Sequence, residues 1–341
     1  MKLPKLFAAV ALAAVTALTG CSMGPTPAAG GTAAQTDTVK VAIIPKINGI
    51  PYYQAVKQGV DEAAKEIGRN VEVIWNGPST AEASEQVKII ENMINAKVNV
   101  IAVAANDPAA VAPALQKAKQ AGIRVMSWDG DANERELFVQ LVDPNAFGAA
   151  LADQMADQVG ETADVAVVTS TLTAPNQSAW LKGIKARIAE KHPGLKIVTT
   201  TESGEDQALA LNQTKDILRA YPDVKGIFAI TTAALPGAAQ AVDSVGMKGK
   251  VAVVGNSTPN AIKQYFKSGV LKSAVLWNPI DHGYLTVYSA LALSKNQVAD
   301  GKEFKAGRLG AYTPVKDEVS EKITLSKPLV FTAENIDKYN F

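Results

Sequence analysis

The chain has 341 residues, with 34 Lys and Arg against 33 Asp and Glu, a formal net charge of +1, and a single cysteine. A charge balance this even argues against a strong field that would attract nucleic acid or an anionic membrane surface. One cysteine excludes a disulfide framework, and about 300 residues of folded chain are enough for two domains of ordinary size.

The first residues have the layout of a secretory signal peptide. Lys2 and Lys5 form a basic start, and the apolar run at 6–18 is too short to span a bilayer as a lasting helix. Leu18-Thr19-Gly20-Cys21 resembles a bacterial lipobox, which implies cleavage before Cys21 and a lipid on its thiol. A plain secretory signal with a chance cysteine is the alternative. We therefore expect a signal peptide at 1–20.

Residues 21–38 are expected to form a flexible tether. The segment from Ser22 to Thr38 is rich in Gly, Pro, Ala and Thr and has no apolar periodicity, which is typical of linkers. No later run in the sequence is long and apolar enough for a second membrane segment. The expected membrane attachment is therefore the lipid on Cys21.

From Val39 onward, apolar runs rich in Val, Ile and Ala alternate with segments of helical spacing. In the first half we expect strands at 39–46, 70–77, 98–107, 123–131 and 138–145, separated by helices at 51–68, 80–97 and 107–122. The alternation restarts with helices at 146–160 and 174–194 and strands at 163–171, 196–203, 224–232, 250–256 and 272–278. Such runs predict parallel sheets covered on both faces. Two series predict an α/β fold of two doubly wound lobes.

Side chains just beyond the strand ends are the candidate ligand-binding residues, because doubly wound folds bind ligands there. They are amides, hydroxyls, a lysine, carboxylates and aromatics. This mixture suits a sugar, whose hydroxyls need donors and acceptors and whose C–H face packs on aromatic rings. Polar residues end most strands, so the match is suggestive rather than specific. The candidates are Lys46, Asn48, Tyr52, Tyr53, Asn106, Trp128, Asp129, Asn176, Gln177, Asn256, Trp277 and Asn278.

Several motifs in order give a more specific indication. They are IPKINGIPYY, GPSTAEASEQV, ANDPAA, VMSWDGD, TAPNQSAW, AALPGAAQA, NSTPN and VLWNP. From about Val39 to its end, the chain resembles the type I periplasmic substrate-binding proteins of ABC importers, in the branch that contains rhamnose-binding proteins and autoinducer-2 (AI-2) receptors. The resemblance implies an extracytoplasmic, lipid-anchored monomer that captures a small sugar or AI-2 and delivers it to a permease, without a cofactor.

The resemblance also implies roles for individual residues. Asp129, in VMSWDGD, would accept ligand hydroxyl hydrogens, with Trp128 beside it as an apolar wall. In the AI-2 receptors a lysine, an aspartate, a glutamine and an Ala-Leu-Pro turn bind the ligand, and the matching residues here are Lys46, Asp129, Gln177, Pro236 and Ala238.

One position departs from the AI-2 receptor pattern. Where those receptors carry a second aspartate, this chain has Asn176. An amide keeps one acceptor, replaces the other with a donor and removes a charge. Asn-Gln before Ser-Ala-Trp is the pattern of the rhamnose-like members, which favours a sugar and leaves AI-2 as the alternative.

Enzyme classes are not favoured. The sequence has no G-x-S-x-G, H-E-x-x-H or Walker A run. Two histidines far apart and one cysteine make a His-based metal site or a Cys/His dyad improbable. A glycosidase would need two opposed carboxylates, such as Asp129 with Asp131 or Asp107. A chemosensory sugar receptor would use the same fold.

The lobes are expected to be joined by a three-strand hinge. Crossings are expected near Leu141 to Asn145, near Asn278 and Pro279, and around Gly301 to Leu309. The resulting bounds are 39–142 plus about 279–305 for the first lobe, and 143–278 plus about 306–341 for the second.

Overall fold

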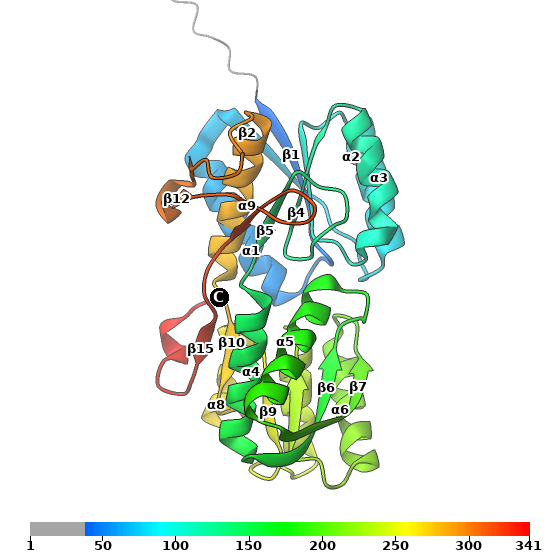
Figure 1. Cartoon of the computed structure of the whole chain (residues 1–341), viewed down its shortest axis with the longest axis vertical. Helices are drawn as coiled ribbons and strands as arrows, with labels where there is room; N and C mark the ends of the chain where they lie inside the picture. Colours follow the sequence, from blue (N-terminus) through cyan, green and yellow to red (C-terminus); the bar gives the residue numbers. More distant parts are fainter. Residues whose placement is uncertain (1–37) are drawn as a thin grey trace, which may run out of the picture. The chain divides into compact units, whose positions relative to one another are not determined.

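The computed structural model describes residues 38–341 (Figure 1). The expected signal peptide, Cys21 and all but the last residue of the expected tether lie outside the described residues. The helices are α1 (Pro51–Ile67), α2 (Ala83–Asn95), α3 (Pro108–Gln120), α4 (Pro144–Val159), α5 (Pro175–Lys191), α6 (Gln207–Ala220), α7 (Ala234–Ser244), α8 (Pro259–Lys267) and α9 (Pro279–Ser294), with short 3₁₀ turns η1 (Gly68–Asn70), η2 (Gly307–Leu309) and η3 (Ile336–Lys338).

Two sheets organise the described chain. The strands are β1 (Val39–Ile44), β2 (Val71–Trp75), β3 (Val100–Val103), β4 (Arg124–Trp128), β5 (Leu137–Gln140), β6 (Thr162–Thr169), β7 (Gly194–Glu202), β8 (Gly226–Ala229), β9 (Ala252–Gly255), β10 (Ala274–Leu276), β11 (Phe304–Lys305), β12 (Ala311–Tyr312), β13 (Val315–Lys316), β14 (Glu321–Thr324) and β15 (Leu329–Phe331). The larger sheet has the order β13-β14-β5-β4-β3-β1-β2, and the smaller has the order β7-β6-β8-β9. We call the parts built on them the first lobe and the second lobe.

The first lobe buries its central sheet on both faces. Strands β1 to β5 are parallel, and alternate residues of each strand point to opposite faces. In β1, Val41 and Ile43 pack with α1 and α9, while Ala42 and Ile44 pack with α2 and α3. Figure 1 shows these helix pairs on opposite sides of the sheet. The near-continuous apolar strands of the sequence follow from this double burial.

The second lobe repeats the plan around β6 to β9, which are all parallel. Helices α4 and α5 pack together, as do α6 and α7. The prediction of two doubly wound parallel-sheet lobes is therefore confirmed. Prolines open α1, α3, α4, α5, α8 and α9, where the missing N–H costs nothing and the fixed φ suits the first turn.

The chain passes between the lobes at 141–143, after β5, and again at Trp277 and Asn278, after β10. Helix α9 belongs to the first lobe and crosses α1 very closely. A Cβ on Gly59 would lie 1.8 Å from the Ile280 carbonyl oxygen, and one on Gly283 would lie 2.0 Å from that of Val56. The two glycines therefore permit the approach that fixes the second crossing to the first lobe.

The third crossing is not where the sequence suggested. Residues 304–312 pack back on α9, where the Arg308 guanidinium pairs with Asp281 and lies 4.4 Å from the centre of the Tyr284 ring. Strand β14 then pairs in parallel with β5, and β15 pairs with β10 beside the second sheet. The chain thus crosses at 325–328, so the predicted crossing at 301–309 and the assignment of 306–324 to the second lobe are wrong.

Candidate functional site

A small, partly open pocket lies between the lobes. Residues that follow the carboxyl ends of strands in both lobes line it, as expected for this architecture. The lining residues are Lys46, Ile50, Tyr52, Tyr53, Asp129, Asn176, Gln177, Trp180, Glu205, Thr232, Asn256 and Trp277. We call this the cleft pocket.

Lys46 supplies the cationic group of the pocket. It follows β1 and is only 2% exposed, and burial lowers the pKa of its ammonium group. Its Nζ donates to Asn176 Oδ1 at 2.6 Å and to Gln177 Oε1 at 3.2 Å. Its own carbonyl accepts from Asn106 Nδ2 at 2.9 Å. A first-lobe lysine is therefore held by two amides of the second lobe.

Asp129 enters the pocket through an unusual backbone turn. Its φ is +58°, a left-handed conformation that aspartate tolerates better than most residues. Its Oδ2 accepts from the Tyr53 hydroxyl at 2.8 Å, and its Oδ1 accepts from Asn176 Nδ2 at 2.6 Å. Burial raises the pKa of the carboxyl group, and the Lys46 charge and the Tyr53 hydrogen bond act in the opposite direction.

Asn176 links the two charged residues. Its amide oxygen accepts from Lys46 and its amide nitrogen donates to Asp129. Only a side chain with an acceptor and a donor on one carbon satisfies a cation and a carboxylate in this way. Asn176 lies in the first turn of α5, which follows the end of β6.

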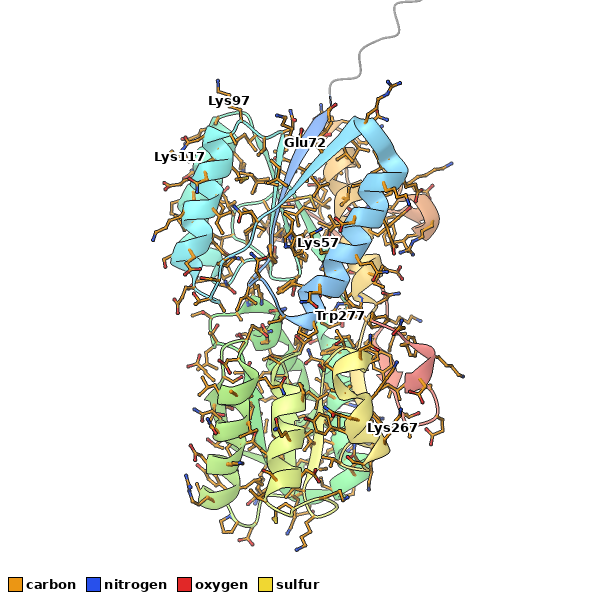
Figure 2. All side chains as sticks on the ribbon, turned by 180° about the vertical axis from the view of Figure 1, so that it is seen from behind. Lys57, Glu72, Lys97, Lys117, Lys267 and Trp277 are labelled. Carbon is orange, nitrogen blue, oxygen red and sulfur yellow. The ribbon has the colours of Figure 1, made fainter. Side chains whose placement is uncertain are left out.

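Aromatic rings form the apolar side of the pocket. Tyr52 and Tyr53 meet edge to face with ring centroids 4.9 Å apart, and Tyr52 meets Trp277 at 6.0 Å. The Trp277 indole N–H donates to the Tyr52 hydroxyl at 3.1 Å. Trp277 lies where the lobes meet (Figure 2), and Trp180 packs against it at 5.5 Å. These faces can cover the C–H surface of a small ring.

Asn256 offers a free acceptor. It is 1% exposed and lines the pocket, and its Oδ1 is buried with no hydrogen-bond partner among residues 38–341. An unpaired buried acceptor costs about 1–3 kcal/mol. A ligand hydroxyl that donates to this oxygen would remove that cost.

Glu205 lines the pocket and was not predicted. It lies between β7 and α6, and Gln177 Nε2 donates to its Oε1 at 3.4 Å. Burial raises the pKa of this half-buried carboxyl to about 7. The strand-end rule that found the other candidates also applies to the run at 196–203, and would have pointed to this loop. Ile50, Trp180 and Thr232 are further lining residues outside the predicted set.

Several predicted residues lie elsewhere. Asn48 contacts Gly77 and Trp75 at the surface. Asn106 holds the Lys46 backbone, and Trp128 is buried behind Tyr53 with ring centroids 5.9 Å apart. Asn278 caps α9, and the structure places the remaining two, Pro236 and Ala238, within buried α7.

Other acids that could have formed a catalytic pair are already engaged. Asp131 pairs with Arg135 at 2.6 Å, and Asp107 accepts two backbone N–H groups at the start of α3. Within residues 38–341, no cluster of His, Cys, Asp and Glu could hold a metal ion. The same residues contain no helix of the length and apolar character that crossing a membrane requires.

Comparison with known proteins gives a consistent set of relatives. Residues 41–298 match the family model described as periplasmic binding protein domain. The chain is 27% identical over 266 residues to a D-ribose/D-allose-binding protein of Pseudomonas aeruginosa, covering 76% of this chain and 82% of the relative. It is 25% identical over 264 residues to the ribose import binding protein RbsB of Escherichia coli, covering 77% and 87%.

Solved structures extend the similarity. An ABC transporter solute-binding protein from Clostridium phytofermentas with bound L-rhamnose has a TM-score of 0.85 and 30% identity, covering 89% of this chain and 98% of that one. LsrB from Clostridium saccharobutylicum in complex with AI-2 has a TM-score of 0.85 and 26% identity, covering 89% and 100%.

Proposed function

Since the chain belongs to the periplasmic binding protein family, we propose that it is an extracytoplasmic solute-binding protein that captures a small neutral sugar of the rhamnose type for an ABC importer. The sugar-binding relatives and neighbours are transport proteins rather than enzymes. A permease is the partner that such a protein requires. The two lobes would close on the ligand by a hinge motion that is favoured because the ligand contacts both lobes.

The Lys46–Asn176–Asp129 network is the observation that carries the proposal. It places one cation and one carboxylate at the pocket wall, each hydrogen-bonded to the same amide. Groups of this kind donate to and accept from hydroxyls in both directions. Opposite charges that are already linked through Asn176 favour a neutral ligand, because an ionic ligand would leave one of them unbalanced in a buried site.

AI-2 is the second candidate ligand. Lys46, Asp129 and Gln177 match the AI-2 receptor motif and all line the pocket, and the LsrB structure has the same fold. Asn176 favours the sugar over AI-2, because it stands where those receptors have an aspartate and uses both its amide oxygen and its amide nitrogen in the network. Pro236 and Ala238, which match the receptor turn, are not among the lining residues.

A thermal-shift screen tests the proposal directly. We expect purified protein to be stabilised by L-rhamnose or a related deoxy or aldose sugar, tested beside D-ribose, D-allose, D-fucose and AI-2. A ligand at about 100 times its dissociation constant adds roughly 2.7 kcal/mol to the free energy of unfolding. Stabilisation by AI-2 alone would transfer the assignment to the second candidate. Recovery of chemically altered sugar would contradict a binding role.

Asn176→Asp separates the two candidates further. The change places a carboxylate where the amide nitrogen now donates to Asp129 Oδ1 at 2.6 Å. Two like charges there oppose closure around a neutral sugar, so we expect calorimetry to show affinity for the sugar lower by about tenfold or more. Any binding of AI-2 should improve, because the variant restores the receptor pattern. Tighter sugar binding by the variant would contradict the proposed role of the amide.

We also propose that Cys21 carries a lipid anchor. The signal-like start and the Leu18-Thr19-Gly20-Cys21 sequence support this, and they lie outside the described residues. Labelled fatty acid should enter the protein in cells that express the full chain, and Cys21→Ser should abolish the labelling. Equal labelling of the variant would contradict the anchor and leave the sugar-binding proposal unaffected.

A further inference from the structure

The loop that carries Glu205 is held firmly against the end of β6. Ser203 N donates to the Thr169 carbonyl oxygen at 2.8 Å, and Gly204 N donates to that of Ser170 at 3.0 Å. Gly204 has a φ of +56°, a conformation that glycine adopts without strain. Asp206 then caps α6 by accepting from Leu209 N at 2.8 Å. Glu205 is thus fixed between two anchored residues, and its side chain lines the cleft pocket.

Among residues 38–341 no cation forms an ion pair with Glu205, and the nearby Lys46 charge only partly opposes the rise in its pKa. The Lys46 ammonium donates to the amide oxygens of Asn176 and Gln177 and forms no ion pair with a carboxylate among residues 38–341. The groups that touch the Glu205 carboxyl are neutral donors, namely Gln177 Nε2 and the hydroxyls of Thr231 and Ser170. A carboxylate with no paired cation is costly to bury, whereas a protonated carboxyl group is not.

Gln177 repeats the arrangement made by Asn176. Its amide oxygen accepts from Lys46 and its amide nitrogen donates to Glu205. The pocket therefore contains one cation and two acids, each acid joined to the cation through one amide. With Asp129 ionised and Glu205 protonated, this set of side chains is neutral overall. A protonated carboxyl also offers a ligand hydroxyl both a donor and an acceptor.

From this geometry we propose that Glu205 is a further ligand-contacting residue, and that it binds a ligand hydroxyl in its protonated form, so that sugar capture takes up a proton. The inference rests on the proposed sugar-binding function. Closing the pocket removes water from the carboxyl group, which favours the protonated form. Affinity is therefore highest at acidic pH and falls as the pH rises.

Proton linkage sets the direction in which sugar affinity changes with pH and the pH range over which it changes. An exposed glutamate has a pKa near 4.5, and burial raises that of Glu205 to about 7. Between these values the closed form holds a proton that the open form lacks. Raising the pH through this window therefore weakens binding, and we expect a decrease of about tenfold or more from about pH 5 to about pH 8.

The contribution of Glu205 to the pH dependence must be distinguished from the contributions of the other titratable groups that face it. They are Lys46 after β1, Asp129 after β4, and Tyr52 and Tyr53 on α1. Burial raises the pKa of Asp129 and lowers that of Lys46, so on closure Asp129 would take up protons as Glu205 does and Lys46 would release them. Because a Glu205→Gln variant keeps these groups, the difference between wild type and variant isolates the contribution of Glu205.

Titration calorimetry with the sugar that gives the largest thermal shift in the panel above tests the inference. Wild type, Glu205→Gln and Glu202→Gln are titrated from about pH 5 to about pH 8, in buffers of different ionisation enthalpy, which reports the protons taken up. Glu202 is the matched control, because it ends β7 directly before the loop that carries Glu205, lies at the surface and does not line the pocket.

We expect wild type and Glu202→Gln to take up as much as about one proton per sugar, whereas Glu205→Gln takes up less and binds with little pH dependence in this window. Glu205→Ala should bind weakly at every pH, because it loses the contact as well as the proton. Tight binding by wild type with the same pH dependence in Glu205→Gln would overturn the inference and leave the sugar-binding function standing. No binding of any panel sugar or AI-2 would overturn the function itself.

Discussion

At the scale of single residues, Asp129 combines a backbone role with a chemical one. Trp128 ends β4 with its side chain in the core, and the left-handed turn at Asp129 then directs the carboxyl group to the pocket. The next residue, Gly130, has no room for a side chain, because a Cβ there would lie 2.4 Å from the Ala105 carbonyl oxygen. The apolar run thus ends in an acid because the chain leaves the core at this point.

Two substitutions at Asp129 separate these roles. Asp129→Gly accepts the positive φ freely but removes the carboxylate, whereas Asp129→Ala removes the carboxylate and adds backbone strain of about 1 kcal/mol or more. We expect both variants to bind sugar at least about tenfold more weakly, since hydrogen bonds to a charged acceptor contribute roughly 1.5–3 kcal/mol each. Thermal unfolding should show Asp129→Ala to be less stable than Asp129→Gly. Near-normal affinity in the glycine variant would show that the carboxylate does not bind the ligand.

At this scale the sequence predicts which residues lie near the pocket better than it predicts which way their side chains point. Strand ends identify which residues come near the pocket, and Lys46, Asp129 and Gln177 were found in this way. Asn106 and Trp128 also follow or end strands, yet they lie behind the pocket wall and support Lys46 and Tyr53. The orientation of a loop side chain depends on the local φ angle and on contacts with residues far away in sequence. Hydrophobic periodicity gives no information on either.

At the scale of elements, a buried ion network fastens the loop after β4 to the segment that leads to the third crossing. Arg135 is 1% exposed in its side chain and pairs with Asp131 at 2.6 Å and with Asp317 at 2.7 Å. It also donates to the Ser320 hydroxyl and lies over the Phe138 ring. The turn between β13 and β14 is therefore attached to the same loop that presents Asp129.

Removing this arginine should cost far more than removing one at the surface. Arg135→Met leaves Asp131 and Asp317 without their shared cation, and both carboxylates keep some contact with water, so we expect denaturant unfolding to show a loss of about 3 kcal/mol, the low end for a buried pair. Arg219 pairs with Asp216 on exposed helix surface, and Arg219→Met is the matched control, with an expected change below about 1 kcal/mol. Equal losses in the two variants would mean that the network does not stabilise the fold.

The same region shows where sequence patterns give too little information. The central strands of both sheets contain the apolar runs that double burial requires, so two lobes could be predicted from them. Strands β11 to β14 are two to four residues long and mostly exposed. Their place in the first lobe depends on strand pairing with β5 and on Arg308 and Arg135. These contacts join residues far apart in sequence, so the third crossing could not be located from local pattern.

At the scale of the whole described chain, the pocket lies at the interface between two lobes that each have their own sheet. Its hydrogen bonds join Lys46, Tyr53 and Asp129 of the first lobe to each other or to the second lobe, and the three crossings permit hinge motion. A ligand that contacts both lobes shifts the equilibrium toward the closed conformation by as much as its affinity for the closed conformation exceeds its affinity for the open one.

Spin labels on opposite lobes should detect this motion. Glu82 precedes α2 and Ala208 lies in the first turn of α6, and both positions are exposed. With Cys21 replaced by serine, cysteines at these two positions can be labelled selectively. We expect the distance distribution measured by pulsed electron resonance to move to shorter values when the sugar is added. A matched pair within the first lobe, at Glu82 and Lys117, should not change. A shift in the control pair would indicate unfolding rather than closure.

The aromatic cluster at the pocket provides an intrinsic fluorescence signal. The four tryptophans of the chain form two contacts, Trp75 with Trp128 and Trp180 with Trp277, and Tyr53 and Tyr52 connect these two pairs through the pocket wall. Nearly all ultraviolet emission of the native chain therefore originates within this one cluster. Tyr52 and Tyr53 also lie close enough to pass excitation to the indoles. A change in the wavelength or intensity of that emission therefore reports ligand binding or lobe closure at the pocket, without any attached dye.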